Sequence, residues 1–146
     1  MTADKSFTVA IVGGGIGGVA LALGLIHNGV SVEIYEQAQK FSEIGAGVSF
    51  GDNALRALAG IAPATLRAFE ENVTYNGYDN KRNVYFDFRH GIGEPELIAS
   101  VSSRAVGQNS IHRADFLDAM VKMIPDSIVH FRKRVVKVEE VENKML

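Results

Sequence analysis

The hydrophobic positions near the start of the chain change their spacing within thirty residues. Residues 7–12, FTVAIV, are apolar apart from one threonine, which is typical of a strand buried on both faces of a parallel sheet. Three glycines follow at 13–15, and residues 16–28 are rich in alanine and leucine, which predicts a helix. Residues 30–36, VSVEIYE, predict a second strand. Strand, helix and strand together form a βαβ unit with a right-handed crossover.

Further along the chain, short helices and alternating strands are predicted. Helical spacing recurs at 53–58 and 63–71, where Pro63 suits a first helical turn. Residues 83–89, NVYFDFR, alternate between apolar and polar positions. This pattern predicts a half-exposed antiparallel strand with its valine and two of its aromatic residues on one face. Residues 97–103, LIASVSS, are its expected neighbour.

The last third of the chain returns to helical spacing and then to strands. Residues 113–124 predict a helix with one apolar face, formed by Phe116, Leu117, Met120, Val121 and Ile124. Strands are expected at 127–131 and 134–141. The whole pattern predicts the α/β class in one domain, 1–146, with a parallel sheet, helices and a small antiparallel β insertion.

Composition removes several classes of function. The 146 residues carry a formal net charge of −2, so no broad basic surface indicates a nucleic-acid partner. The sequence has no cysteine, which excludes disulfides and a cysteine zinc site and is compatible with a cytoplasmic protein. Its four histidines show no metal-ligand spacing, so no metal is expected. The apolar stretch 9–26 contains six glycines, which a phosphate-binding turn explains better than a membrane span.

The first turn contains the pattern G-x-G-x-x-G at Gly13, Gly15 and Gly18. The first glycine permits a tight turn, the second lets the backbone approach a pyrophosphate, and the third allows close packing of helix on strand. The start of the helix offers free N–H groups to the phosphates. Glu36 ends the second strand at the position where a carboxylate accepts hydrogen bonds from ribose hydroxyls. Its charge would repel a 2′-phosphate, which argues against NADP at this site.

Other readings of these residues remain open at this stage. The glycines also suit a packing turn without a ligand, and Glu36 also suits a solvated strand end. The fingerprint alone does not distinguish NAD from FAD. A plain NAD-dependent dehydrogenase is therefore an alternative function, and it is weaker than the two functions given at the end of this section.

Three stretches resemble, in order and spacing, the FAD-dependent monooxygenases of the salicylate hydroxylase type. They are VAIVGGGIGGVALALGLIHNGVSVEIYEQ, EIGAGVSFGDNALRAL and SIHRADFLDAM. The resemblance extends over residues 7–138 and implies a Rossmann-like FAD-binding domain of the glutathione-reductase type. It also implies FAD as the cofactor, NAD(P)H as a transient reductant and an aromatic small molecule as the substrate.

The resemblance also implies which residues hold FAD. The glycine turn and Glu36 correspond to the contacts with its ADP half. Gly47 and Ser49 lie, by resemblance, beside the flavin, and Arg113 reaches the ribityl and phosphate groups. The strand near Val136 lies against the adenine in that family. No side chain is singled out as catalytic, because the cofactor carries the chemistry.

The sequence departs from the family pattern in two places. Asp52 stands where the family usually has proline, and a helix N-cap is one reading of it. The downstream Asp-Gly and Gly-Asp motifs of the family are not found, which predicts a truncated FAD-binding portion without a complete substrate domain. Two functions follow: the FAD-binding part of a monooxygenase, or an inactive relative that binds FAD or ADP or serves as an interaction module. A complementing C-terminal half that restores activity would indicate the first function, continued inactivity would indicate the second, and self-association is the alternative form of partner.

Overall fold

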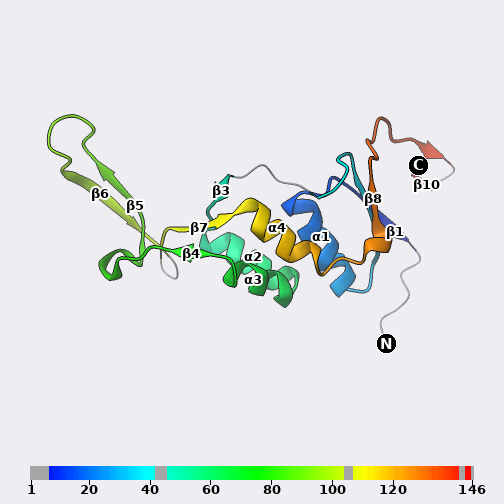
Figure 1. The fold of residues 1–146 in the computed structure, drawn as a ribbon, viewed down its shortest axis with the longest axis horizontal. Helices are drawn as coiled ribbons and strands as arrows, with labels where there is room; N and C mark the ends of the chain where they lie inside the picture. The colour runs from blue at the N-terminus through cyan, green and yellow to red at the C-terminus, as the bar shows by residue number, and fades with distance from the viewer. Residues whose placement is uncertain (1–6, 42–45, 104–106, 142–143, 146) are drawn as a thin grey trace. The chain divides into compact units, whose positions relative to one another are not determined.

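The computed structural model describes residues 7–41, 46–103, 107–141 and 144–145 (Figure 1). The chain divides into two compact units. Unit 1 comprises residues 1–43 and 117–146, and unit 2 comprises residues 44–116. Each unit has its own secondary structure, and the helix α4 (Arg113–Val121) contains the boundary between them.

Unit 1 is built on the predicted βαβ motif. Strands β1 (Thr8–Val12) and β2 (Ser31–Glu36) are parallel and are connected by helix α1 (Ile16–His27). The short strand β8 (Val129–Phe131) adds to β2 in parallel, so the order is β1-β2-β8. The 3-10 turn η2 (Asp126–Ile128) leads into β8.

Helix α1 packs on β1 and β2, and one face of the sheet forms the core with it. The buried apolar side chains of unit 1 are Ile11, Val19, Ala20, Ala22, Leu23, Val30, Val32, Ile34, Leu117, Met120 and Ile124.

Val12 on β1 is 64% exposed, and β1 has one neighbouring strand among the described residues. The expectation that residues 7–12 are buried on both faces is therefore wrong for this chain, because only one side of β1 is covered.

The end of the chain differs from its predicted strand. Of residues 134–141, only β9 (Glu140–Val141) is a strand, and it pairs in antiparallel fashion with β10 (Lys144–Met145). Alternating valines gave the strand prediction, but Val136 is 89% exposed and Val138 is 60% exposed. An alternating pattern forms a strand only where a partner strand satisfies its backbone groups.

The described residues of unit 2 form helices α2 and α3, the first residues of α4 and two antiparallel sheets. Helix α2 (Asp52–Ile61) and helix α3 (Pro63–Glu70) pack together, and Pro63 occupies the first turn of α3 as predicted. The hydroxyl of Thr65 donates to the carbonyl oxygens of Leu58 at 2.7 Å and Ala62 at 2.8 Å. These bonds satisfy carbonyls at the end of α2 and fix the junction of the helices.

A three-stranded antiparallel sheet completes the core of unit 2. Its order is β3 (Gly47–Val48), β7 (Asn109–His112) and β4 (Thr74–Tyr75). Phe50, Phe69 and Phe116 form an aromatic cluster with ring centroids 5.2 to 6.1 Å apart. Edge-to-face and tilted contacts of this kind add to the stabilisation from burial alone.

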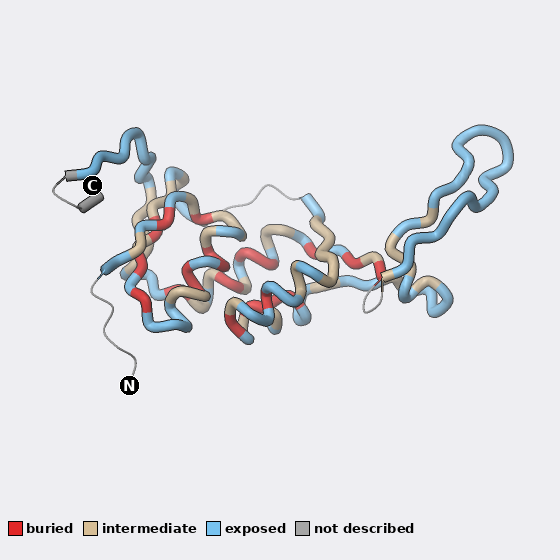
Figure 2. Tube along the Cα trace, turned by 180° about the vertical axis from the view of Figure 1, so that it is seen from behind, coloured by how far each residue is buried: buried red, intermediate tan, exposed pale blue. Residues whose placement is uncertain are grey.

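The predicted antiparallel pair forms a hairpin of β5 (Val84–Arg89) and β6 (Leu97–Ser102), which follows the 3-10 turn η1 (Asp79–Lys81). Most of the hairpin is exposed (Figure 2). Phe86 is 50% and Phe88 is 54% exposed, so the expected apolar face is only half covered within the described chain. The α/β class with a parallel sheet and antiparallel sheets is confirmed.

Asp52 is not the N-cap of its helix. Gly51 occupies that position, and Asp52 is the first helical residue. The Ser103 hydroxyl donates to the Asp52 carboxylate at 2.9 Å. A carboxylate in the first turn interacts favourably with the helix dipole, which explains its place without the N-cap role.

Candidate functional site: the glycine turn and its pocket

The backbone after β1 makes the turn that the glycine pattern predicted. Gly13 has a φ of +102°, a region that side chains disfavour, and its N–H donates to the Tyr35 carbonyl at 2.9 Å. A Cβ atom on Gly18 would lie 2.0 Å from the Gly13 carbonyl oxygen. The third glycine of the pattern is therefore required for the close approach of α1 to the turn.

Helix α1 begins directly at this turn. Gly15 is its N-cap with an extended backbone, and the first turn contains no acidic residue and no side-chain cap. The first N–H groups of a helix lack partners within the helix, and together they favour an anion. The turn after β1 thus leads into a helix start that is suited to an anion.

Glu36 connects this turn to the end of β2. Its carboxylate accepts a hydrogen bond from the Gly14 N–H at 2.6 Å and another from the Ala38 N–H at 2.7 Å. Hydrogen bonds to an ionised acceptor are stronger than neutral ones. The acid singled out in the sequence is therefore held in place by the backbone of the glycine turn.

Gly14 was not singled out in the sequence, although the structure gives it a specific role. A Cβ atom there would lie 2.6 Å from the ring of Phe41 and 3.3 Å from the Glu36 carboxylate. The absence of a side chain lets both groups approach the turn. The run of three consecutive glycines was the signal, because the fingerprint itself needs only two of them.

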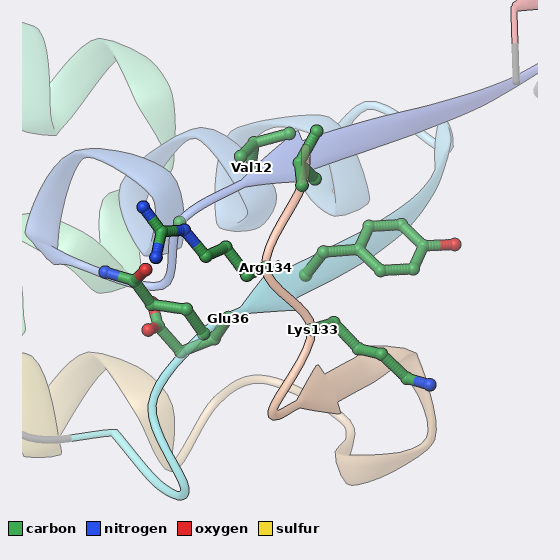
Figure 3. Close-up of a pocket in the computed structure, with 8 residues that line it drawn as sticks. Val12, Glu36, Lys133 and Arg134 are labelled. Carbon is green, nitrogen blue, oxygen red and sulfur yellow. The ribbon is translucent and has the colours of Figure 1, made fainter. Parts of the chain in front are cut away.

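A pocket of about 220 Å³ opens beside Glu36 (Figure 3). It is lined by Val12, Gly13, Tyr35, Glu36, Gln37, Lys133, Arg134 and Val135. All eight residues belong to unit 1 and come from the ends of β1 and β2 and from the segment after β8. Ligands of parallel α/β sheets bind outside the carboxyl ends of the strands, which is where this pocket lies.

Val136 follows the last residue that lines the pocket. Its side chain is almost fully exposed, and it belongs to no strand. Val136 is adjacent in sequence to Val135, which lines the pocket, but Val136 is not itself a lining residue.

Unit 2 brings the other predicted residues together. Gly47 pairs with His112 across β3 and β7, and the Arg113 N–H donates to the Ala46 carbonyl at 3.2 Å. Arg113 is the first residue of α4. Antiparallel pairing therefore places the GAGVSF and HRADF segments side by side, as a joint site requires. Gly45 lies outside the described residues.

Ser49 and Gly47 have tightly packed surroundings. The Ser49 and Tyr85 hydroxyl oxygens lie 3.4 Å apart, and a Cβ atom on Gly47 would lie 3.1 Å from the Ser110 hydroxyl oxygen. A side chain at position 47 would thus force a neighbouring strand residue to move. The glycine at this position permits the observed packing of β3 on β7.

Asn109 is a positioning residue that the sequence reading missed. It is 1% exposed, and its side-chain amide makes two hydrogen bonds with the backbone of Phe50. It therefore fixes the segment that contains Ser49. A buried asparagine at the first position of a strand gives no periodic signal, since only its partners distinguish it from a loop residue.

Two other kinds of site find no support among the described residues. No group of three or more histidine, aspartate and glutamate side chains is arranged to hold a metal ion there. Within the same residues, no helix combines the length and apolar character needed to cross a bilayer.

The chain is similar to known monooxygenases along nearly its whole length. It is 47% identical over 144 residues to the 6-methylsalicylate 1-monooxygenase atA of Aspergillus terreus, covering 96% of this chain and 32% of that protein. It is 44% identical over 142 residues to a salicylate hydroxylase of Pseudomonas putida, with the same two coverages. The chain therefore spans about a third of the length of these relatives. No protein-family model matches the sequence.

Comparison of the fold with solved structures also finds monooxygenases. A solved salicylate hydroxylase in complex with its substrate matches 95% of this chain with a TM-score of 0.75 and 30% identity, over 33% of its own length. A solved FAD-containing monooxygenase from Photorhabdus luminescens matches 94% of this chain with a TM-score of 0.70. The resemblance of this chain to FAD-dependent aromatic monooxygenases of the salicylate hydroxylase type is confirmed.

Proposed function

We propose that this chain is the FAD-binding part of a flavin-dependent monooxygenase that hydroxylates an aromatic substrate with NAD(P)H and O₂. The observation that carries the proposal is the Glu36 carboxylate held by the Gly14 N–H beside the start of α1. The similarity of the chain to salicylate and 6-methylsalicylate monooxygenases supports an aromatic substrate. The same similarity favours this function over an inactive interaction module.

The residues of unit 1 fit the ADP half of FAD. The N–H groups at Gly15 and in the first turn of α1 would bind the pyrophosphate. Each carboxylate oxygen of Glu36 accepts one backbone hydrogen bond, and a carboxylate oxygen can accept two. Glu36 thus keeps acceptor capacity for the two ribose hydroxyls, and its charge would repel the additional phosphate of NADP.

The residues of unit 2 are proposed to serve the flavin half. Gly47 and Ser49 would present backbone to the flavin, and the Arg113 guanidinium would bind ribityl or phosphate oxygens, for which its forked geometry is suited. Val136 is proposed to lie near the adenine, as an extension of the pocket wall at Val135. The antiparallel pairing of Gly47 with His112 brings together the segments that contain Gly47, Ser49 and Arg113. This pairing supports a joint role of these three residues.

FAD, when bound, would supply the redox chemistry with NAD(P)H and O₂. The chain's own residues would bind and orient it. We also propose that residues 1–146 form the N-terminal part of an FAD-binding domain of the glutathione-reductase type. The parallel order β1-β2-β8 and the coverage of about a third of the relatives support this assignment.

Titration of the purified chain with FAD and NAD⁺ tests the proposal. FAD should bind more tightly than NAD⁺, and the protein should purify with flavin absorbance or acquire it on addition of FAD. NADP⁺ is the matched probe for Glu36 and should bind more weakly than NAD⁺. Tighter binding of NAD⁺ than of FAD would instead indicate a nicotinamide-dependent dehydrogenase.

A further inference from the structure

The pocket beside Glu36 contains an arginine that nothing in the known chemistry of the site uses. Arg134 lines the pocket, is exposed, and makes no hydrogen bond or ion pair with another residue in the described part of the chain. We propose that its guanidinium stacks on the adenine base of the bound dinucleotide. This inference rests on the proposed function and names a further residue of the same site.

The backbone before Arg134 is held in an unusual conformation. Arg132 has a φ of +58°, which is the left-handed region, and it is the one non-glycine residue with a positive φ among the described residues. Its N–H donates to the Ala38 carbonyl at 2.9 Å, and the next N–H, of Lys133, donates to the Glu36 carbonyl at 2.9 Å. Strained backbone of this kind persists where its surroundings hold it and is concentrated at functional sites.

These bonds make Glu36 a junction of three segments. Its carboxylate binds the glycine turn and the Ala38 N–H, and its carbonyl binds the segment that contains Arg134. Glu36 and Arg134 line the same pocket, so a ligand bound there can meet both residues. The backbone directly before Arg134 is held at Arg132 and Lys133 by their hydrogen bonds to the Ala38 and Glu36 carbonyls.

Arg134 and Lys133 are adjacent cations with different directions. Figure 3 shows the Arg134 side chain extending toward the side of the pocket where Glu36 lies, whereas Lys133 extends away from it. Both oxygens of Glu36 already accept backbone hydrogen bonds. No ion pair joins the Arg134 guanidinium to this carboxylate in the described part of the chain, so the guanidinium remains available to a ligand.

The composition of the pocket indicates a base more than a phosphate. Val12, Tyr35 and Val135 supply apolar surface around Arg134, which suits the flat face of a purine. A guanidinium is planar and weakly hydrated, and it stacks on aromatic faces. The phosphates already have donors at the start of α1. Adenine is therefore the part of a dinucleotide that this corner of the pocket fits best.

FAD titrations of the 146-residue chain and three variants test the proposal. Arg134→Ala should weaken FAD by about five- to thirty-fold, the range expected for a desolvated cation on an aromatic face. Arg134→Lys should recover only part of this loss, since an ammonium lacks the planar surface. Lys122→Ala, at an exposed lysine that does not line the pocket, is the matched control and should stay within about two-fold of the wild type. Circular dichroism verifies that all four proteins have the same fold.

Two further probes separate the base from the phosphates. Inorganic pyrophosphate, used as a competitor of FAD, should bind equally well to the wild type and to Arg134→Ala. FMN, which lacks the adenine, should also bind the two proteins equally. An equal loss of affinity for FAD and for pyrophosphate would overturn the proposal in favour of a phosphate contact.

The proposal and the function beneath it fail in different ways. Wild-type FAD affinity in a folded Arg134→Ala variant would overturn the role of Arg134 and leave the FAD site intact. A wild-type chain that does not bind FAD at all would overturn the proposed function and this inference together.

Discussion

The side-chain amide of Asn109 is bound to the backbone of Phe50 at both ends. Its Oδ1 accepts from the Phe50 N–H at 2.9 Å, and its Nδ2 donates to the Phe50 carbonyl at 2.7 Å. The two residues are 59 positions apart in the sequence. This pair holds the segment after β3 against β7 and so positions the residues proposed to face the flavin.

Asn109→Ala should lower the free energy of unfolding by about 1–3 kcal/mol, because it leaves the partly buried Phe50 N–H and carbonyl without these partners. Asn109→Asp should be at least as destabilising, since a carboxylate cannot donate to the Phe50 carbonyl. Urea denaturation measures both. Asn80→Ala, at an exposed asparagine of η1, is the control and should change stability by less than about 0.5 kcal/mol. An Asn109→Ala variant as stable as this control would show that the pair is not stabilising.

Two glycines of α1 should respond oppositely to alanine. A Cβ atom on Gly18 would lie 2.0 Å from the Gly13 carbonyl oxygen, whereas one on Gly17 would have no neighbour within 4 Å. Gly18→Ala should therefore destabilise the protein by about 1–3 kcal/mol or more. Gly17→Ala should stabilise it by about 0.5–1 kcal/mol through helix propensity. Thermal unfolding of both variants tests this, and equal effects would contradict the close packing at Gly18.

Glycine should be better tolerated than arginine at position 132. The left-handed conformation costs a residue with a Cβ about 1–2 kcal/mol, and glycine avoids this cost but loses about 0.5–1 kcal/mol of backbone entropy. Arg132→Gly should thus raise the free energy of unfolding by up to about 1 kcal/mol, whereas Arg132→Ala should not raise it. Urea denaturation of the two variants and the wild type measures these changes in the free energy of unfolding. Greater stability of the alanine variant would contradict the positive φ at this residue.

Asp87 on the hairpin should titrate below the ordinary aspartate value of 3.8. Hydrogen bonds from the Lys81 ammonium and then the Ser100 hydroxyl lower the pKa of its carboxyl, and Arg89 adds a weaker attraction. Because the folded-state pKa is lowered, this contribution to stability is present above about pH 3.8 and is lost as the pH falls through the lower value.

Carboxyl chemical shifts measured across the acid range test the Asp87 prediction. Lys81→Met should raise the Asp87 pKa more than Ser100→Ala does, since the lysine bond has the larger effect. A wild-type Asp87 that titrates at or above 3.8 would show that these contacts do not form in solution.

The βαβ unit could be predicted from the sequence because its determinants are local. The glycine turn and the alanine- and leucine-rich stretch at 16–28 predicted α1 to within one residue of its observed end, His27. The side-by-side placement of Gly47 and Arg113 required the family resemblance, since pairing between β3 and β7 depends on segments far apart in the sequence.

Other features depend on contacts that a pattern does not contain. The exposed side of Val12 reflects what packs against β1, and a strand of the same composition would be buried if a second layer covered it. Arginine is not a residue that indicates a left-handed turn, so Arg132 gave no signal. The Gly14 hydrogen bond to Glu36 joins residues 22 positions apart and became visible only in the folded chain.

The central claim is that the turn at the start of α1 binds the pyrophosphate of FAD. The most direct measurement is calorimetric titration of FAD into the wild type, Gly15→Val and the control Gly60→Ala, at a glycine of α2 where a Cβ atom would have no neighbour within 4 Å. The wild type and Gly60→Ala should bind FAD with similar affinity. Gly15→Val should keep its far-ultraviolet circular dichroism but show no measurable binding, because the added side chain would occupy the space of the pyrophosphate. A folded Gly15→Val variant that binds FAD as tightly as the wild type would contradict the claim.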